Sequence, residues 1–103
     1  MPNFMFAYHG GSAPQSPEEA EKVMAEWNAW FGSIGNGVVE PGNPVGLSKT
    51  VSVSGIADDG GSNPISGYSV IAADTIEAAC EIAQACPIVN DGGSVEVAEI
   101  HEM

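Results

Sequence analysis

The alternation of hydrophobic and polar residues predicts four strands. Residues 3–9 and 68–73 are mostly apolar on both faces, which is typical of strands that are covered on both sides. Residues 49–53 alternate strictly, so they predict a strand with one polar face that lies near a sheet edge. Residues 94–101 predict the last strand, with apolar side chains on each face.

Two helices are predicted between these strands. The first begins where Ser16 can cap the backbone and Glu19 completes a capping box, and it ends at the glycines that start with Gly35. Asp74 is the expected cap of the second helix, and Pro87 is expected to stop it. Apolar residues recur at helical spacing in both segments. The solvent side of the first helix is expected to carry Glu18, Glu21, Lys22 and Glu26.

Turn-forming residues separate these elements. Residues 40–46 and 90–93 predict turns, and residues 55–66 predict a loop rich in Gly, Asp, Ser, Asn and Pro. The order is therefore β-α-β-β-α-β, which is the pattern of a ferredoxin-like fold. It predicts one α+β domain over residues 1–103, in which two helices cover one face of a four-stranded antiparallel sheet.

The second face of this predicted sheet has no cover within the chain. The strands over residues 3–9 and 68–73 would expose an apolar surface there, and soluble monomers rarely expose large apolar patches. We therefore expect two copies to pack their sheets face to face in a symmetric homodimer.

Charge narrows the choice of partners. Fourteen Asp and Glu residues against Lys22 and Lys49 give a net charge of −12, and there is no arginine. Because phosphate binding requires clustered Lys and Arg, we expect no nucleic acid and no anionic membrane as a partner. The first residues have neither the basic start nor the long apolar run of a signal peptide or a membrane helix.

The cysteines and histidines give further expectations. Cys80 and Cys86 are six residues apart on the second predicted helix and point to roughly opposite sides. We therefore expect two reduced thiols and a cytoplasmic protein. His9 and His101 are too few to form a metal site, and no cofactor is expected.

Several short motifs together resemble the YCII-related family of dimeric α+β barrel proteins, and the resemblance covers almost the whole chain. They are Tyr8-His9-Gly10-Gly11, the SPEE helix start at Ser16, the pair Trp27 and Trp30, residues 42–46, Gly67-Tyr68, residues 73–79, Cys86-Pro87 and residues 93–97. The resemblance implies a face-to-face dimer with a pocket between the helices and the sheet edges, and a family whose functions are mostly unknown.

The chain lacks sequence features that are found in some members of the family it resembles. In a few relatives a His on the first helix and an Asp before the Pro that follows the second helix act as a pair. Here Cys86 takes the place of that Asp, and the first helix has no His. The DGPF signature of another branch is also broken, because Asp59-Gly60 is followed by Gly61 and Ser62.

His9 is the candidate acid or base. It ends the first predicted strand beside two glycines that permit close approach of another molecule. The alternative is a hydrogen-bonded His at a strand end. The sequence leaves its partner open among Asp91, Glu99 and His101.

Aromatic residues and one lysine are the candidate binding residues. Trp27 and Trp30 are either walls of a pocket for a planar molecule or core residues packed on the sheet, and Tyr8 and Tyr68 leave the same choice. Lys49 either orients a carboxylate or phenolate or is a solvated strand lysine.

Cys86 is a possible nucleophile by its chemistry. A buried thiol at the end of a helix has a raised pKa, however, so we expect an unreactive core residue.

Three functions follow from these residues. The first is binding of a small molecule in an apolar, aromatic-lined pocket. The second is a lyase-type or isomerase-type reaction on hydrophobic or aromatic substrates, with His9 as acid or base. The third is a dimeric partner-binding subunit without chemistry.

Overall fold

The computed structural model describes residues 1–103. Its elements are, in chain order, β1 (Asn3–His9), α1 (Pro17–Ile34), the 3-10 turn η1 (Gly35–Gly37), β2 (Val38–Glu40), β3 (Thr50–Ser52), β4 (Gly55–Ala57), β5 (Ile65–Ala72), α2 (Ile76–Gln84), α3 (Pro87–Asn90) and β6 (Ser94–Glu99).

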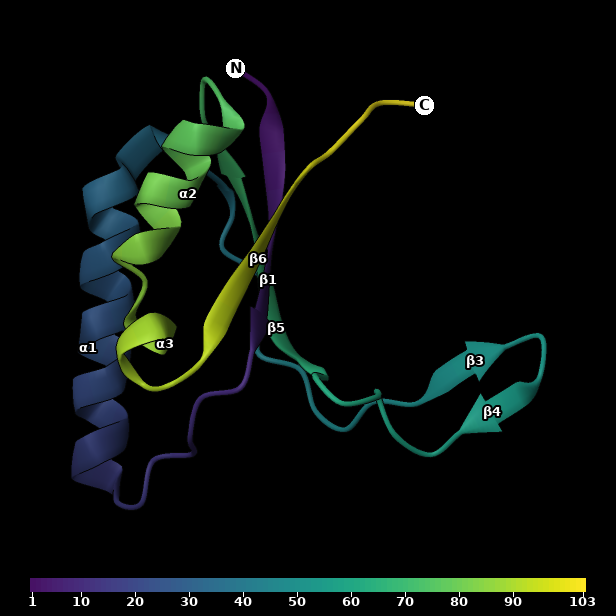
Figure 1. Cartoon of the computed structure of the whole chain (residues 1–103). Coiled ribbons are helices and arrows are strands. Elements are labelled where there is room, and N and C mark those ends of the chain that lie inside the picture. The colour runs from purple at the N-terminus through teal and green to yellow at the C-terminus, as the bar shows by residue number, and fades with distance from the viewer.

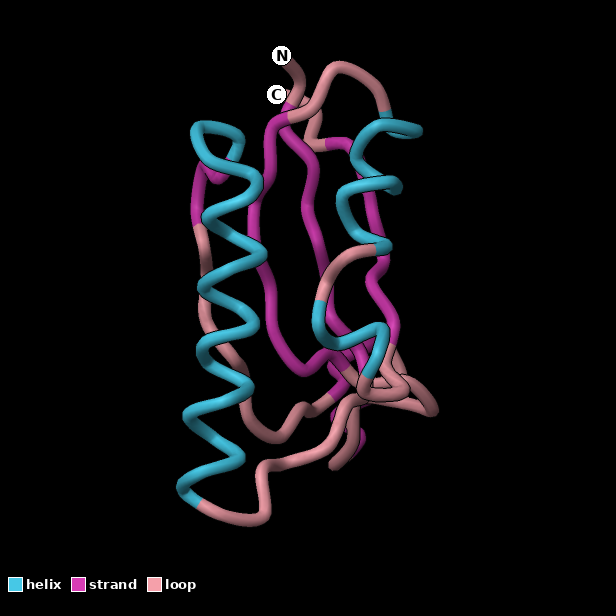
Figure 2. Tube along the Cα trace, turned by 90° about the vertical axis from the view of Figure 1, so that its left-hand side faces the viewer, coloured by secondary structure: helices cyan, strands magenta, loops and turns pink.

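Four antiparallel strands form the main sheet in the order β2-β5-β1-β6. Phe6 in β1 lies opposite Ser69 in β5 and Val97 in β6, so these three side chains share one face of the sheet. The helices cover this face, and Figures 1 and 2 show α1 and α2 side by side on it. The predicted α+β architecture, with a four-stranded antiparallel sheet and helices, is confirmed.

The core lies between the sheet and the helices. Phe4 and Phe6 contribute from β1, Trp30 from α1, Ile71 from β5 and Ala79 from α2, and all are buried. Such burial removes apolar area from water, which is the main source of stability in a domain of this size.

Local signals explain where the helices begin and end. The Ser16 side chain accepts a hydrogen bond from the Glu19 backbone N–H, so the predicted cap of α1 is confirmed. The expected cap Asp74 is wrong, because the Thr75 hydroxyl accepts from the Ala78 N–H at 3.1 Å. A cap side chain must reach the third residue of the helix, and the helix starts one residue later than predicted.

The end of α2 also differs from the prediction. The helix stops at Gln84, and Pro87 takes the first position of α3, where its missing N–H costs nothing. The turn predicted at residues 90–93 is present at Asp91 and Gly92, directly after α3 and before β6.

The second strand of the main sheet was predicted at the wrong place. Residues 49–53 do contain a strand, β3, but it pairs with β4 in a separate two-stranded hairpin. The strand β4 lies within residues 55–66, which were predicted as a loop. The edge strand of the main sheet is instead β2, which follows η1 directly and pairs with β5. Alternation describes a strand with one polar face but does not say which strand it joins.

We call residues 46–62, which contain this hairpin, the arm. Figure 1 shows the arm and the C-terminal tail leaving the body on the side of the sheet that the helices do not cover. We call that side the open face. Met5, Ala7, Tyr68 and Val70 occupy it, and all are partly or largely exposed. Within one chain, β1 and β5 are therefore buried on one face only, and the expected burial of their second face depends on the predicted dimer.

Candidate functional site

A cavity of about 810 Å³ lies at the end of the sheet where β1 stops. The loop 10–13, the first half of α1, α3 and residues 44–45 surround it. Five of its sixteen lining residues are hydrophobic, so it is more polar than the apolar, aromatic-lined pocket expected from sequence.

Two glycines turn the chain from β1 into the wall of this cavity. Gly10 and Gly11 have φ angles of 78° and 83°, a region that other residues rarely adopt. The turn carries Ser12 toward the end of α3, where its backbone N–H and its hydroxyl donate to the Asp91 carboxylate at 2.8 and 2.9 Å. The loop and the end of α3 are thereby tied together in the wall of the cavity.

These two hydrogen bonds also fix the charge of Asp91. They favour the ionised carboxylate, so they lower the pKa of Asp91 below its usual value. Asp91 therefore presents a fixed negative charge to the cavity at neutral pH.

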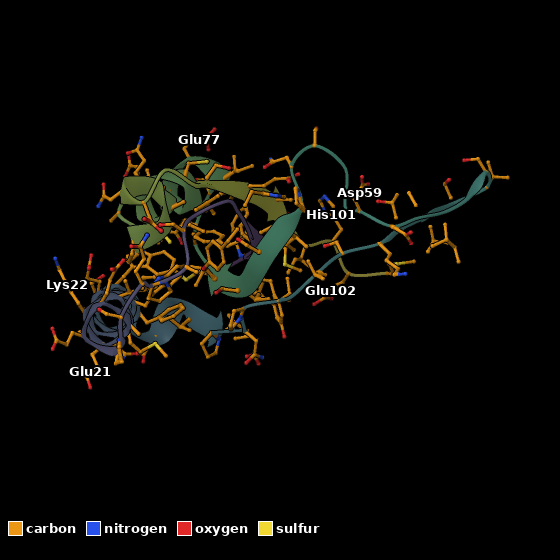
Figure 3. All side chains as sticks on the ribbon, turned by 90° about the horizontal axis from the view of Figure 1, so that it is seen from below. Glu21, Lys22, Asp59, Glu77, His101 and Glu102 are labelled. Atoms are coloured by element: carbon orange, nitrogen blue, oxygen red, sulfur yellow. The ribbon has the colours of Figure 1, made fainter.

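The first half of α1 supplies the opposite wall. Trp27 is half-buried and reaches the cavity one turn after Val23, while Glu19 and Glu26 add carboxylates. Lys22 is the one cation there, and Figure 3 shows its side chain pointing outward from the helix. The site has three carboxylates and one ammonium group, so it favours neutral or cationic molecules.

Trp27 is the only predicted binding residue at this cavity. It lies edge-on to Tyr8, with ring centres 5.0 Å apart, and edge-on to Trp30 at 5.7 Å. Trp30 is 5% exposed, and its Nε1 donates to the Ile82 carbonyl at 3.1 Å, so it belongs to the core.

Tyr8 is also a core residue. Its hydroxyl donates to Ser69 Oγ at 2.7 Å, and Ser69 donates to the Pro41 carbonyl at 2.6 Å. Burial raises the pKa of the Tyr8 hydroxyl well above its usual range, so the group stays neutral as a structural donor.

His9 lies at the root of the arm rather than at the cavity. Its Nδ1 is 2.9 Å from the Asn63 carbonyl oxygen and 3.2 Å from that of Pro64, and its Nε2 is 3.0 Å from Glu96 Oε1. Because Nδ1 faces two acceptors, it carries a proton and donates. Both ring nitrogens are engaged, and the partner Glu96 was not among those considered from sequence.

Tyr68 and Lys49 lie elsewhere. Tyr68 is on the open face, where its hydroxyl accepts from Asn43 Nδ2 at 3.4 Å. Lys49 is in the arm and pairs with Asp58 at 3.2 Å, with both side chains largely exposed. The structure thus distributes the predicted site residues over the core, the cavity, the open face and the arm.

Cys86 is fully buried, and burial raises the pKa of its thiol to about 11. A neutral thiol is a poor nucleophile, so Cys86 acts as a core residue. Cys80 is exposed, and both cysteines are free.

A second cavity of about 390 Å³ lies at the root of the arm, between residues 45–48 and 58–61. Ser66 lines both cavities, and its buried hydroxyl has no hydrogen-bond partner.

Sequence reasoning missed most of the polar groups at the larger cavity. Glu19, Val23, Glu26 and Trp27 share one side of α1 by their spacing of three and four residues, so this part could have been found. The pairing of Ser12 with Asp91 joins residues 79 positions apart, and no local pattern indicates it.

No three or more His, Cys, Asp or Glu side chains are grouped so that they could hold a metal ion. None of the helices combines the length and the apolar character needed to cross a membrane. The chain matches no protein-family model, no curated protein and no solved structure.

Proposed function

We propose that this chain binds a small organic molecule in the cavity between loop 10–13, α1 and α3. The observation that carries the proposal is the combination of one large aromatic wall, Trp27, with a carboxylate that two hydrogen bonds hold in place, Asp91. Ligand sites typically combine such an aromatic surface with a few fixed polar groups in volumes of roughly 300–1,000 Å³. The cavity of about 810 Å³ falls in this range.

The charges indicate the class of ligand. Glu19, Glu26 and Asp91 outnumber Lys22, and the chain as a whole carries −12, so an anionic ligand would be repelled. A cationic group can lie against the face of an indole ring and pair with a carboxylate at once. We therefore favour a neutral or cationic molecule with a planar part.

We also propose that the chain adopts the ferredoxin-like arrangement of the YCII-related proteins that its motifs resemble, and that it forms a homodimer through the open face. The strand order β2-β5-β1-β6 and the helices on one face support the arrangement. The partly exposed apolar residues of the open face support the dimer.

Binding is favoured over acid–base catalysis because of where His9 lies. Its ring lines neither of the two cavities described above, and both of its nitrogens are held by protein groups. A general base must reach the proton that it abstracts.

Three aromatic probes that differ mainly in charge test the binding proposal: benzylamine, benzyl alcohol and benzoate. We expect the first two to shift the amide NMR signals of loop 10–13 and α3, and benzoate to leave them unchanged. Trp27→Leu should weaken binding of both probes, and Asp91→Asn should weaken benzylamine more than benzyl alcohol.

Glu81→Gln on α2 is the matched control, because it removes one carboxylate away from the cavity. Shifts that are equal for all three probes, or that survive in Trp27→Leu, would contradict the proposed site.

A further inference from the structure

The arm carries an apolar surface that nothing in the chain covers. Val51 and Ile56 are directly opposite each other in the hairpin, so they lie on the same face, and they are 75% and 69% exposed. Leu47, just before the hairpin, and Val53, at its turn, add two more apolar side chains to the arm, and each is fully exposed. Figure 3 shows the side chains of the arm standing clear of the body.

The arm is nevertheless braced in its extended shape. Thr50 Oγ1 donates to the Asp59 carbonyl at 2.7 Å, and Lys49 pairs with Asp58 at 3.2 Å. At the root, His9 donates to the carbonyl oxygens of Asn63 and Pro64, which ties the returning chain to the end of β1. A two-stranded hairpin without packing is marginally stable in water, so this one needs a surface to cover its apolar face.

The chain exposes more surface than a typical monomer of its mass, and this excess supports an interface with a partner. The chain exposes 7003 Å², whereas the scaling for monomers gives about 5,400 Å² at its mass of 10.5 kDa. The difference, about 1,600 Å², exceeds the roughly 800 Å² that each partner buries in a standard interface. The Cα radius of gyration of 14.7 Å is likewise larger than the ~13 Å of a compact chain of this length.

The distribution of charge favours a second copy as the partner. Two chains of charge −12 meet with least repulsion where acidic residues are few, and interface cores are depleted of charge. The central strands β1 and β5 contain no Asp or Glu, and neither do residues 46–57, which include Lys49. The acidic residues of the open face, Glu40 opposite Val70 and Glu96 opposite Ala7, lie on the outer strands β2 and β6. The arm and the open face lie on the same side of the sheet (Figure 1), so two facing copies can cover each other's apolar surfaces symmetrically.

We propose that the arm packs through Leu47, Val51, Val53 and Ile56 onto a second copy of this chain that is docked on the open face. This inference rests on the homodimer proposed above and adds a second contact to it. The exchange of two arms would bury the least charged parts of both chains.

Sedimentation equilibrium on single-residue variants tests the role of the arm. Val51→Asp and Ile56→Asp place a charge in the proposed contact, and we expect each to raise the dimer Kd at least about tenfold. Ser52→Asp is the matched control, because it adds the same charge to the opposite face of the same strand, and it should change Kd by less than about threefold. The arm lies outside the core, so circular dichroism should show all three variants to be folded.

Val70→Asp separates the two proposals, because it alters the open face and not the arm. If Val70→Asp is monomeric while Val51→Asp and Ile56→Asp dimerise like the wild type, the arm contact is overturned and the face-to-face dimer stands. An equal effect of Ser52→Asp and Val51→Asp would also overturn the arm contact, since charge alone would then explain the loss. A wild-type chain that is monomeric at all concentrations would overturn both.

Discussion

The two faces of the main sheet differ in how their apolar side chains are covered. On the helix-covered face Phe4, Phe6 and Ile71 are at most 1% exposed, whereas on the open face their neighbour Met5 is 37% exposed. The buried and the more exposed side chains alternate along the same strands, β1 and β5. Apolar side chains on the second face are not needed to build the two-layer core, so the comparison supports the proposal that a second copy covers this face.

The largest expected effect comes from substituting two neighbouring residues of β1, one on each face of the sheet. Phe6→Ala should lower the free energy of unfolding by about 3–5 kcal/mol, because it opens a cavity in the core. Met5→Ala, its neighbour on the open face, should lower it by less than about 1 kcal/mol under conditions that keep the chain monomeric. Urea unfolding at low protein concentration measures both. Equal losses would show that the two faces are packed alike.

Gly42 tests how closely the chain after β2 packs against the main sheet. Its φ is 75°, and a Cβ there would collide with the backbone of Tyr68 in β5. Gly42→Ala should therefore destabilise the chain by about 2 kcal/mol or more. Gly46→Ala is the control, since no atom lies within 4 Å of a Cβ at that position. The midpoints of thermal unfolding compare the two variants, and a control that loses as much as Gly42→Ala would argue against the close approach.

High pH should lower the free energy of unfolding, because the core on the helix-covered face contains the buried thiol of Cys86. Burial raises the pKa of Cys86 to about 11, against 9.0 for an ordinary thiol, so the folded state favours the neutral form. Stability is then fully present below pH 9 and falls as the pH rises toward 11, by less than about 3 kcal/mol.

Urea unfolding at pH 8 and at pH 10 measures this loss. Tyr8, whose pKa is also raised by burial, adds a loss in the same direction at still higher pH. Cys86→Ala should remove most of the decline between pH 8 and pH 10. An unchanged decline in that variant would show that another group causes it.

The smallest expected effect concerns the open face. Because each chain carries −12, salt should relieve the repulsion between two copies and lower the dimer Kd. We expect a decrease of about threefold or more between 0.02 and 0.2 M NaCl, measured by sedimentation equilibrium. A Kd that rises with salt would indicate an interface held by ion pairs, which the central strands β1 and β5, without Asp or Glu, do not provide.

Sequence reasoning was accurate where the signal is local. The strand β1 and the capped start of α1 depend on neighbouring residues, and both were predicted. The edge strand β2 was missed because its three residues have no informative alternation, and its place depends on pairing with β5. Residues 49–53 alternate clearly, but the same alternation suits a free hairpin and a sheet strand.

The candidate site shows the same division between local and distant signals. Trp27 was identified from its spacing in a helix, although the sequence left open whether it lines a pocket or fills the core. Asp91 became a site residue only through its hydrogen bonds to Ser12, which the fold brings together from the two ends of the chain.

The mass of the wild-type chain in solution tests the central claim most directly. Native mass spectrometry at low micromolar concentration should give twice the chain mass of 10.5 kDa, and Val70→Asp should give the single chain. A wild-type protein that stays at the single-chain mass would contradict the claim that a second copy covers the open face.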